Sequence, residues 1–212
     1  MRLILVRHGE SHHAKRGVIV GDVGCTGLTD RGIDQADRLA NRFRLTGEVE
    51  DGVALLSSPF LRAYQTAEVL EKALPGSRIE IDNDLVEVRP GRADGLSWNE
   101  YRSRFGAFDL PAEPERPFAP GGESWSDFVR RVRAVLDRLA ERFDGQTVVA
   151  VTHAGFIVLT LLDLFSIPPA VKRARLDPIH TSLTEWQVSN NVWRLERYND
   201  AYHLLDRHSA KE

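Results

Sequence analysis

The chain has 212 residues, of which 42% are hydrophobic and 28% are charged, and its formal net charge is −3 at pH 7. This composition predicts one domain over residues 1–212, and the negative charge argues against nucleic acid as the main partner. The one cysteine, Cys25, excludes an intramolecular disulfide. The apolar run before Arg7 is too short for a signal peptide, and the stretch 147–162, which His153 interrupts, is too short for a membrane span. We therefore expect a cytoplasmic protein that does not enter a membrane.

The first half of the chain alternates between predicted strands and helices. An apolar strand over residues 3–6 is followed by a helix capped at Thr29 and by a second strand over residues 53–56. A further helix is expected to begin at Ser58 and Pro59, with Ser58 as its cap. The helix after Thr29 has an apolar face made of Ile33, Ala36, Leu39, Ala40 and Phe43.

The second half continues this alternation and ends in a hairpin. Ser97 and Glu100 form a capping box for a short helix, and Ser124 begins a long amphipathic helix. A strand over residues 147–151 leads into another helix, and a closing hairpin turns at the Asn-Asn pair 190–191. The inward face of the long helix comprises Trp125, Phe128, Val129, Val132, Leu136, Leu139 and Phe143. Alternating strands and helices predict an α/β fold, a three-layer αβα sandwich with a mostly parallel central sheet.

Residues 5–11, LVRHGES, place an Arg-His pair and a flexible glycine directly after the first strand. Guanidinium and free peptide N–H groups suit a phosphate dianion, and an imidazole either shares a proton with it or attacks phosphorus. Taken alone, the stretch also fits an edge strand with a solvated basic end.

Two further segments supply the context for this motif. SSPFLRAYQTA, residues 57–67, places Arg62 near a helix N-terminus, and VVAVTHAGFIVL, residues 148–159, places His153 at the end of a strand. Singly, His153 fits a buried core histidine and Arg62 a solvated helix residue. In open α/β sheets, however, ligands bind beyond the carboxyl ends of the strands, where helix N-termini favour anions. Gathering these groups at one place would be costly without an anion, so together they predict a phosphoryl site.

These motifs resemble those of the histidine phosphatase superfamily, in its phosphoglycerate mutase-like branch 1 and its compact phosphatase type. The RHG, SSPxxRAxQTA and HAG segments follow the order and spacing of the family. Three intervening segments are also similar to it, namely GLTDRGIDQA at 27–36, DLVEVRPGRADGL at 84–96 and GGESW at 121–125. The resemblance extends over most of the chain and implies a phosphoglycerate mutase-like fold.

The resemblance also implies roles for individual residues. His8 would be the nucleophile that becomes phosphohistidine, while Arg7, Arg62 and His153 would hold the phosphoryl oxygens. The catalytic set implied in this way is His8, Glu87, Arg7, Arg62 and His153. The substrate-binding set is Arg7, Arg62, His153, Ser11 and Ala154.

Glu87, four residues before Gly91, matches the proton donor of the family, although a surface glutamate beside Arg89 would have the same local sequence. Phosphoryl transfer relies mainly on positioned positive charge. His8 must be neutral to attack, whereas Glu87 must be protonated to donate to an alkoxide. We therefore predict a bell-shaped pH profile in the mildly acidic to neutral range and no cofactor.

A metal site built from His8, His12, His13 and His153 is a rival interpretation. The sequence has no HExxH motif and no paired-cysteine spacing, and Arg7 would oppose the charge of a metal ion. We expect no metal. We place His12 and His13 on the loop after the first strand, either at the mouth of the site or in solvent.

The family leaves phosphatase and mutase activity both open. Cofactor-dependent mutases have a longer insertion after the proton donor, whereas this chain has only a lid-like segment at about 88–120. Aromatic side chains in this segment either pack within the lid or stack on a substrate, and they are Trp98, Tyr101, Phe105 and Phe108. We therefore expect a metal-independent phosphomonoester hydrolase acting on a small phosphorylated metabolite. A mutase-type phosphotransferase and a catalytically silent phosphate-binding regulatory module are the alternatives.

Two positions depart from the pattern of the family. Ala14 and His180 stand where relatives often have asparagine, and both concern the leaving-group side of the substrate. The physiological substrate, the pathway and the oligomeric state, including a homodimer, are left open by the sequence.

Overall fold

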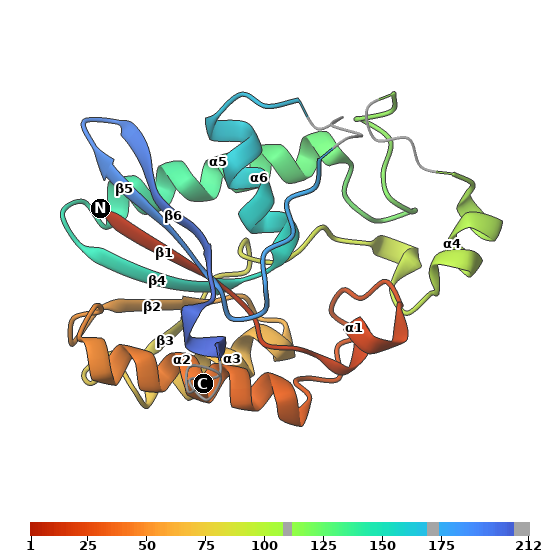
Figure 1. Ribbon diagram of the computed structural model, residues 1–212. Helices are drawn as coiled ribbons and strands as arrows, with labels where there is room; N and C mark the ends of the chain where they lie inside the picture. Colours follow the sequence, from red (N-terminus) through yellow and green to blue (C-terminus); the bar gives the residue numbers. More distant parts are fainter. Residues whose placement is uncertain (108–111, 169–173, 206–212) are drawn as a thin grey trace.

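The computed structural model describes residues 1–107, 112–168 and 174–205, although not the side chains of residues 14 and 15. One mixed sheet contains six strands in the order β3-β2-β4-β1-β5-β6 (Figure 1). The strands are β1 (Arg2–Arg7), β2 (Ala54–Ser57), β3 (Ile79–Ile81), β4 (Thr147–Thr152), β5 (Leu183–Ser189) and β6 (Val192–Asp200). The first four of these strands run parallel to one another, and β5 and β6 add antiparallel pairs. The predicted mostly parallel sheet is therefore confirmed.

Helices cover both faces of this sheet, with α2 and α3 on one face and α5 and α6 on the other (Figure 1). The α-helices are α1 (His12–Arg16), α2 (Asp30–Thr46), α3 (Leu61–Glu71), α4 (Trp98–Phe105), α5 (Trp125–Arg142) and α6 (Ala154–Leu164), and the 3-10 helices are η1 (Gly91–Ala93) and η2 (Tyr202–Leu204). Leu3 and Leu5 of β1 join the core under α5 and α6, whereas Ile4 and Val6 join the core under α2 and α3. This alternation shows a strand buried on both faces, as expected for the centre of a parallel sheet. Within the described residues, no helix has both the length and the apolar character needed to span a membrane.

The predicted apolar face of α2 is correct except at Ile33, which is 44% exposed. The first turn of α2 contacts the loop after β1 through Gly32 and Gln35 instead. The side chain of Gln35 accepts a hydrogen bond from the backbone N–H of Glu10 at 2.9 Å. This contact turns Gln35 inward and leaves Ile33 toward solvent.

Three of the four predicted caps are present as expected, and one is not. Thr29 accepts from Gly32 N, and Ser97 and Ser124 form capping boxes with Glu100 and Asp127. Ser58 does not cap α3, because the helix begins at Leu61 with Phe60 at the N-cap position. The hydroxyl of Ser58 faces the sheet edge described below.

The closing hairpin and the lid-like segment complete the fold. The turn between β5 and β6 places Asn190 and Asn191 at φ 49° and 60°, a left-handed conformation that asparagine tolerates, so the predicted hairpin is confirmed. Next to the main cores, Tyr101 of α4 stacks on Phe118 at 4.7 Å between ring centroids, whereas Trp98 remains 47% exposed. Of the aromatic side chains predicted for the lid-like segment, Tyr101 is therefore packed and Trp98 is exposed. Phe108 lies outside the described residues.

Candidate active site

The residues singled out from the sequence lie at the carboxyl ends of three neighbouring strands. Arg7 and His8 follow β1, Arg62 lies in the first turn of α3 after β2, and His153 joins β4 to α6. Arg7 is in register with Thr152 of β4, so the two motifs end at the same level of the sheet. A cavity of about 860 Å³ opens at this edge. Its wall includes Arg7, His8, Arg62, Glu87, Ala154 and Gly155.

The ring of His8 has a defined tautomer. Its Nδ1 lies 2.7 Å from the carbonyl oxygen of Gly9, and because a carbonyl only accepts, Nδ1 must hold the proton. The other ring nitrogen, Nε2, then carries no proton, and its lone pair accepts a hydrogen bond from the Nε–H of Arg62 at 3.1 Å. His8 is only 5% exposed, and its Nε2 faces the guanidinium of Arg62. This arrangement gives a buried neutral imidazole that can attack an electrophile.

The surroundings of His8 keep it neutral. Burial lowers the pKa of His8 well below its ordinary range. The positive charge of Arg62, the ring of His153 and the charge of Arg7 lower this pKa further. The hydrogen bond to Gly9 opposes these effects and is the weakest of them. The sequence argument that flanking guanidiniums disfavour the cationic form agrees with these causes.

The two guanidinium groups are held from different sides. Arg62 is 2% exposed, and its Nη1 donates to the thiol of Cys25 at 3.3 Å. Arg7 donates through Nη1 to the carbonyl of Pro178 and lies 3.8 Å from the carboxylate of Asp177. Arg62 has no carboxylate among these contacts, so its charge remains available to an anion.

His153 is fully buried beside His8, with 5.1 Å between the two ring centroids. Its Nε2 lies 2.8 Å from the hydroxyl of Ser58. Burial lowers the pKa of His153 well below its ordinary range, and the charge of Arg62 is the next largest cause. Ser58 therefore orients a second neutral imidazole at the sheet edge instead of capping a helix.

Four buried nitrogen atoms around His8 have no hydrogen-bond partner among the described residues. They are Arg7 Nε, His13 Nδ1, His153 Nδ1 and His180 Nε2. Leaving a buried polar atom unpaired is costly, and such atoms in a native site are satisfied by a ligand, an ion or ordered water. Within the described residues, no three His, Cys, Asp or Glu side chains form a group able to hold a metal ion.

Glu87 lies on the same cavity wall and is held by backbone N–H groups. Its Oε2 accepts from Gly155 N at 2.8 Å, and its Oε1 accepts from Val88 N at 3.1 Å. A Cβ atom at position 155 would overlap Oε1 and lie 2.9 Å from the carboxyl carbon. Gly155 is therefore the residue that lets the carboxyl of Glu87 approach the N-terminus of α6.

The remaining predicted residues lie in different places. Ala154 lines the cavity, whereas Ser11 is fully buried, lies 3.3 Å from His13 Nε2 and is not part of the wall. His13 lines the cavity from helix α1, where a loop was expected. His180 reaches the site as well, with its ring centroid 5.7 Å from that of His8. The departure at position 14 falls on a side chain outside the described part of the chain.

Sequence reasoning missed several residues that support this arrangement. Ser58 and Gly155 lie inside the motifs, but Ser58 was predicted as a helix cap and Gly155 was given no role. Thr66 was also missed; its Oγ1 accepts from Gly9 N at 3.0 Å and so anchors the loop after β1 on α3. The signal for all three residues is their place within the SSPxxRAxQTA and HAG segments.

A comparison with protein families matches residues 3–201 to the histidine phosphatase superfamily, branch 1. The chain belongs to this superfamily. Mycobacterial relatives, among them a bifunctional protein of Mycobacterium tuberculosis, are 33% identical to this chain over 187 residues. That match includes 87% of the chain but 50% of the relative, so the chain spans about half the length of these relatives. A metal-independent phosphoserine phosphatase of Arabidopsis thaliana is 28% identical over 95% of the chain and 82% of its own length.

Solved structures resemble this chain over nearly its whole length. The phosphoserine phosphatase of Entamoeba histolytica, solved as a mutant with phosphoserine, matches with a TM-score of 0.78 and 25% identity, over 96% of the chain and 99% of its own. A mycobacterial glucosyl-3-phosphoglycerate phosphatase, solved with VO3, matches with a TM-score of 0.75 and 26% identity, over 94% and 99% of the two chains. The family and the fold expected from the motifs are therefore confirmed.

Proposed function

We propose that this protein is a metal-independent phosphomonoester hydrolase that acts on a small phosphorylated metabolite through a phosphohistidine intermediate. The observation that supports this most strongly is the neutral His8, whose Nε2 accepts a hydrogen bond from Arg62 Nε at 3.1 Å. A phosphoryl group bound between these two would be next to both the nucleophile and a cation. Positioning and compensating charge are the main requirements of phosphoryl transfer.

In the first step, His8 Nε2 attacks phosphorus and an N–P bond forms. The bond from phosphorus to the leaving oxygen breaks, and the protonated carboxyl of Glu87 gives its proton to that oxygen, so a neutral alcohol departs. Arg7, Arg62 and His153 supply hydrogen-bond donors to the phosphoryl oxygens. The Nδ1 proton stays on His8, where the carbonyl of Gly9 accepts it.

In the second step, water attacks the phosphohistidine. The carboxylate of Glu87 takes a proton from the water, the N–P bond breaks, and inorganic phosphate leaves with His8 neutral again. Glu87 ends the cycle protonated, as it began. The scheme uses only side chains that border or adjoin the same cavity.

The names of relatives support a phosphatase and indicate the size of its substrates. A phosphoserine phosphatase and a glucosyl-3-phosphoglycerate phosphatase share the fold at 25% and 26% identity. A probable phosphoglycerate mutase of Yersinia enterocolitica is also 29% identical over 96% of the chain. Phosphotransfer therefore remains the second candidate, and the short lid-like segment is the feature that favours hydrolysis.

The test is phosphate release from a panel of phosphomonoesters in the presence of EDTA, with 2- and 3-phosphoglycerate assayed for interconversion as well. We compare the wild type with His8→Ala and use His12→Ala, on the exposed side of α1, as the matched control. We expect release that is lost in His8→Ala and retained in His12→Ala. Interconversion without release would assign the protein to the mutases. Absence of turnover, or turnover that survives His8→Ala, would overturn the proposal.

A further inference from the structure

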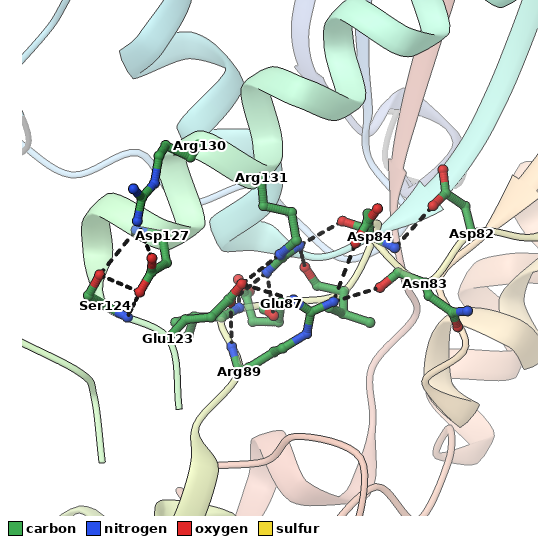
Figure 2. A network of polar contacts seen from close by, with 12 residues as sticks. Asp82, Asn83, Asp84, Glu87, Arg89, Glu123, Ser124, Asp127, Arg130 and Arg131 are labelled. Atoms are coloured by element: carbon green, nitrogen blue, oxygen red, sulfur yellow. Dashed lines mark hydrogen bonds and ion pairs between the residues drawn. The ribbon is translucent and has the colours of Figure 1, made fainter. Parts of the chain in front are cut away.

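Arg131 of α5 forms an ion pair with Glu123, which lies just before this helix, and the pair is bonded to the stretch of chain that contains Glu87 (Figure 2). Arg131 Nε donates to Glu123 Oε1 at 2.8 Å, and Arg131 Nη2 donates to Glu123 Oε2 at 2.7 Å. The two side chains are only 8% and 11% exposed. Such a bidentate pair fixes direction as well as distance.

The other donors of Arg131 bind the backbone around Glu87 (Figure 2). Nη1 donates to the carbonyls of Asp84 at 2.6 Å and Val86 at 2.9 Å, and Nη2 donates to the carbonyl of Glu87 at 3.1 Å. Together with the bonds to Glu123, these contacts use every N–H of the guanidinium. A lysine has fewer donors and no planar fork, so it would not reproduce this set.

Glu123 extends the attachment to the far side of Glu87. Its Oε2 accepts from Arg89 N at 2.9 Å, and its own N–H donates to Arg89 O at 2.9 Å. Arg131 therefore holds the backbone up to Glu87, and Glu123 holds it two residues beyond. The stretch between them cannot shift without breaking charge-assisted bonds, of which those to Arg131 are partly buried.

We infer that Arg131 and Glu123 are positioning residues, which hold Glu87 in place for proton transfer to the leaving oxygen. This inference rests on the proposed function. The carboxyl of Glu87 is aimed by backbone N–H groups of Val88 and Gly155, and these point correctly only while the main chain keeps its place. Proton transfer requires hydrogen-bond distance, and a displacement of about 1 Å is enough to weaken it.

Substrates with different leaving groups distinguish a role in positioning Glu87 from a general role in stabilising the fold. An alkoxide, as from glycerol 2-phosphate, leaves poorly unless it is protonated, whereas 2,4-dinitrophenolate leaves without a proton. The ratio kcat/KM includes steps only up to formation of the phosphoenzyme, so it reports the step in which Glu87 acts as an acid. Loss of positioning should therefore lower kcat/KM for the first substrate and not for the second.

The experiment measures kcat/KM for both substrates in Arg131→Lys, Glu123→Gln and Glu87→Gln. Arg130→Lys is the matched control, because Arg130 lies next to Arg131 on α5, is 68% exposed in its side chain and pairs with Asp127. We expect Arg131→Lys and Glu123→Gln to lose about 10- to 100-fold on glycerol 2-phosphate and less than about threefold on 2,4-dinitrophenyl phosphate. Glu87→Gln should show the same pattern more strongly, and Arg130→Lys should match the wild type.

Vanadate affinity and thermal unfolding check that each variant is folded with an intact phosphate site. Equal losses on both substrates would show a merely structural role and overturn the inference, as would wild-type rates on both. If one variant does not fold, the other still decides, because Glu123→Gln keeps the shape of the pair and Arg131→Lys keeps its charge. A wild type that hydrolyses neither substrate would instead contradict the proposed function.

Discussion

Replacing Gly155 by alanine tests the proposed role of Glu87 without replacing a catalytic group. A Cβ atom at this position would overlap Glu87 Oε1 and lie 3.0 Å from Oε2. Gly155 has no left-handed φ, so its backbone accepts alanine without strain. The three nearest of the surrounding atoms all belong to the end of the Glu87 side chain, which moves more easily than the backbone. We therefore expect the carboxyl of Glu87 to turn away and the fold to persist.

The magnitudes follow from the contacts that change. Losing the bond from Gly155 N–H to the carboxylate of Glu87 costs about 1.5–3 kcal/mol. Alanine has a higher helix propensity than glycine, which raises the free energy of unfolding by about 1 kcal/mol. The net loss in the free energy of unfolding should thus be about 0.5–2 kcal/mol. Activity should fall more steeply, by about 10- to 100-fold on an alkyl phosphomonoester, because the proton donor is displaced.

A double-mutant cycle with Glu87→Ala isolates the contact. Truncating Glu87 removes the atoms that the new methyl group would meet, so Gly155→Ala should then leave the remaining activity unchanged and should not destabilise the protein. The assays are kcat/KM on glycerol 2-phosphate and urea unfolding of all four proteins. An equal activity loss from Gly155→Ala in both backgrounds would refute this reasoning, as would full activity of the single variant.

Three further predictions concern stability and the orientation of the second histidine. Burial lowers the pKa of His13 and of His180 to about 4. As the pH falls, these histidines bind protons in the unfolded state near pH 6.5 and in the folded state only near pH 4. The free energy of unfolding should therefore be highest above pH 6.5 and decrease as the pH falls toward about 4. The melting temperature of His180→Asn should decrease less over this pH range. Asp200 accepts from two arginines, at 2.7 and 3.1 Å, so Asp200→Asn should lower the free energy of unfolding in urea by about 1–2 kcal/mol and leave activity unchanged. Ser58→Ala removes the partner of His153 at 2.8 Å, and kcat should fall about tenfold with normal melting; unchanged kcat would show that His153 needs no such partner.

The fold was predictable wherever a local pattern sufficed. The β1, β2 and β4 strands are apolar runs that stop at a polar motif, and α5 shows helical spacing after a serine cap, so residue types alone locate them. The short strand β3 was not predicted, because its three residues are half-buried or exposed and show no clear pattern. The role of Ser58 was predicted wrongly, because its position before Pro59 is typical of a cap while its hydroxyl bonds a histidine 95 residues away.

The approach of His8 to Arg62 was expected because both motifs follow predicted strands, and the carboxyl ends of parallel strands meet at one edge of the sheet. The contact of Glu87 with Gly155 follows no such rule, since it joins positions 68 residues apart through one backbone N–H. The same holds for Arg131, which reaches the backbone of Asp84 across 47 residues. Contacts of this kind depend on the packing of α5 and α6 against the sheet, which periodicity does not specify.

The site therefore combines two kinds of construction. The proposed nucleophile, His8, and the two arginines beside it are placed by the ends of neighbouring strands, where the sheet holds the backbone and burial favours a neutral His8. The carboxyl of Glu87 comes instead from a segment outside regular secondary structure, where the backbone has no ladder to hold it. Precision there has to come from specific bonds, and the bonds from Arg131 and Glu123 supply it. The bonds from Arg131 and Glu123 are needed because the proposed proton of Glu87 has to reach the leaving oxygen of the substrate. The position of that oxygen is set by His8 and the arginines at the strand ends, so the loop that contains Glu87 has to be held in place relative to them.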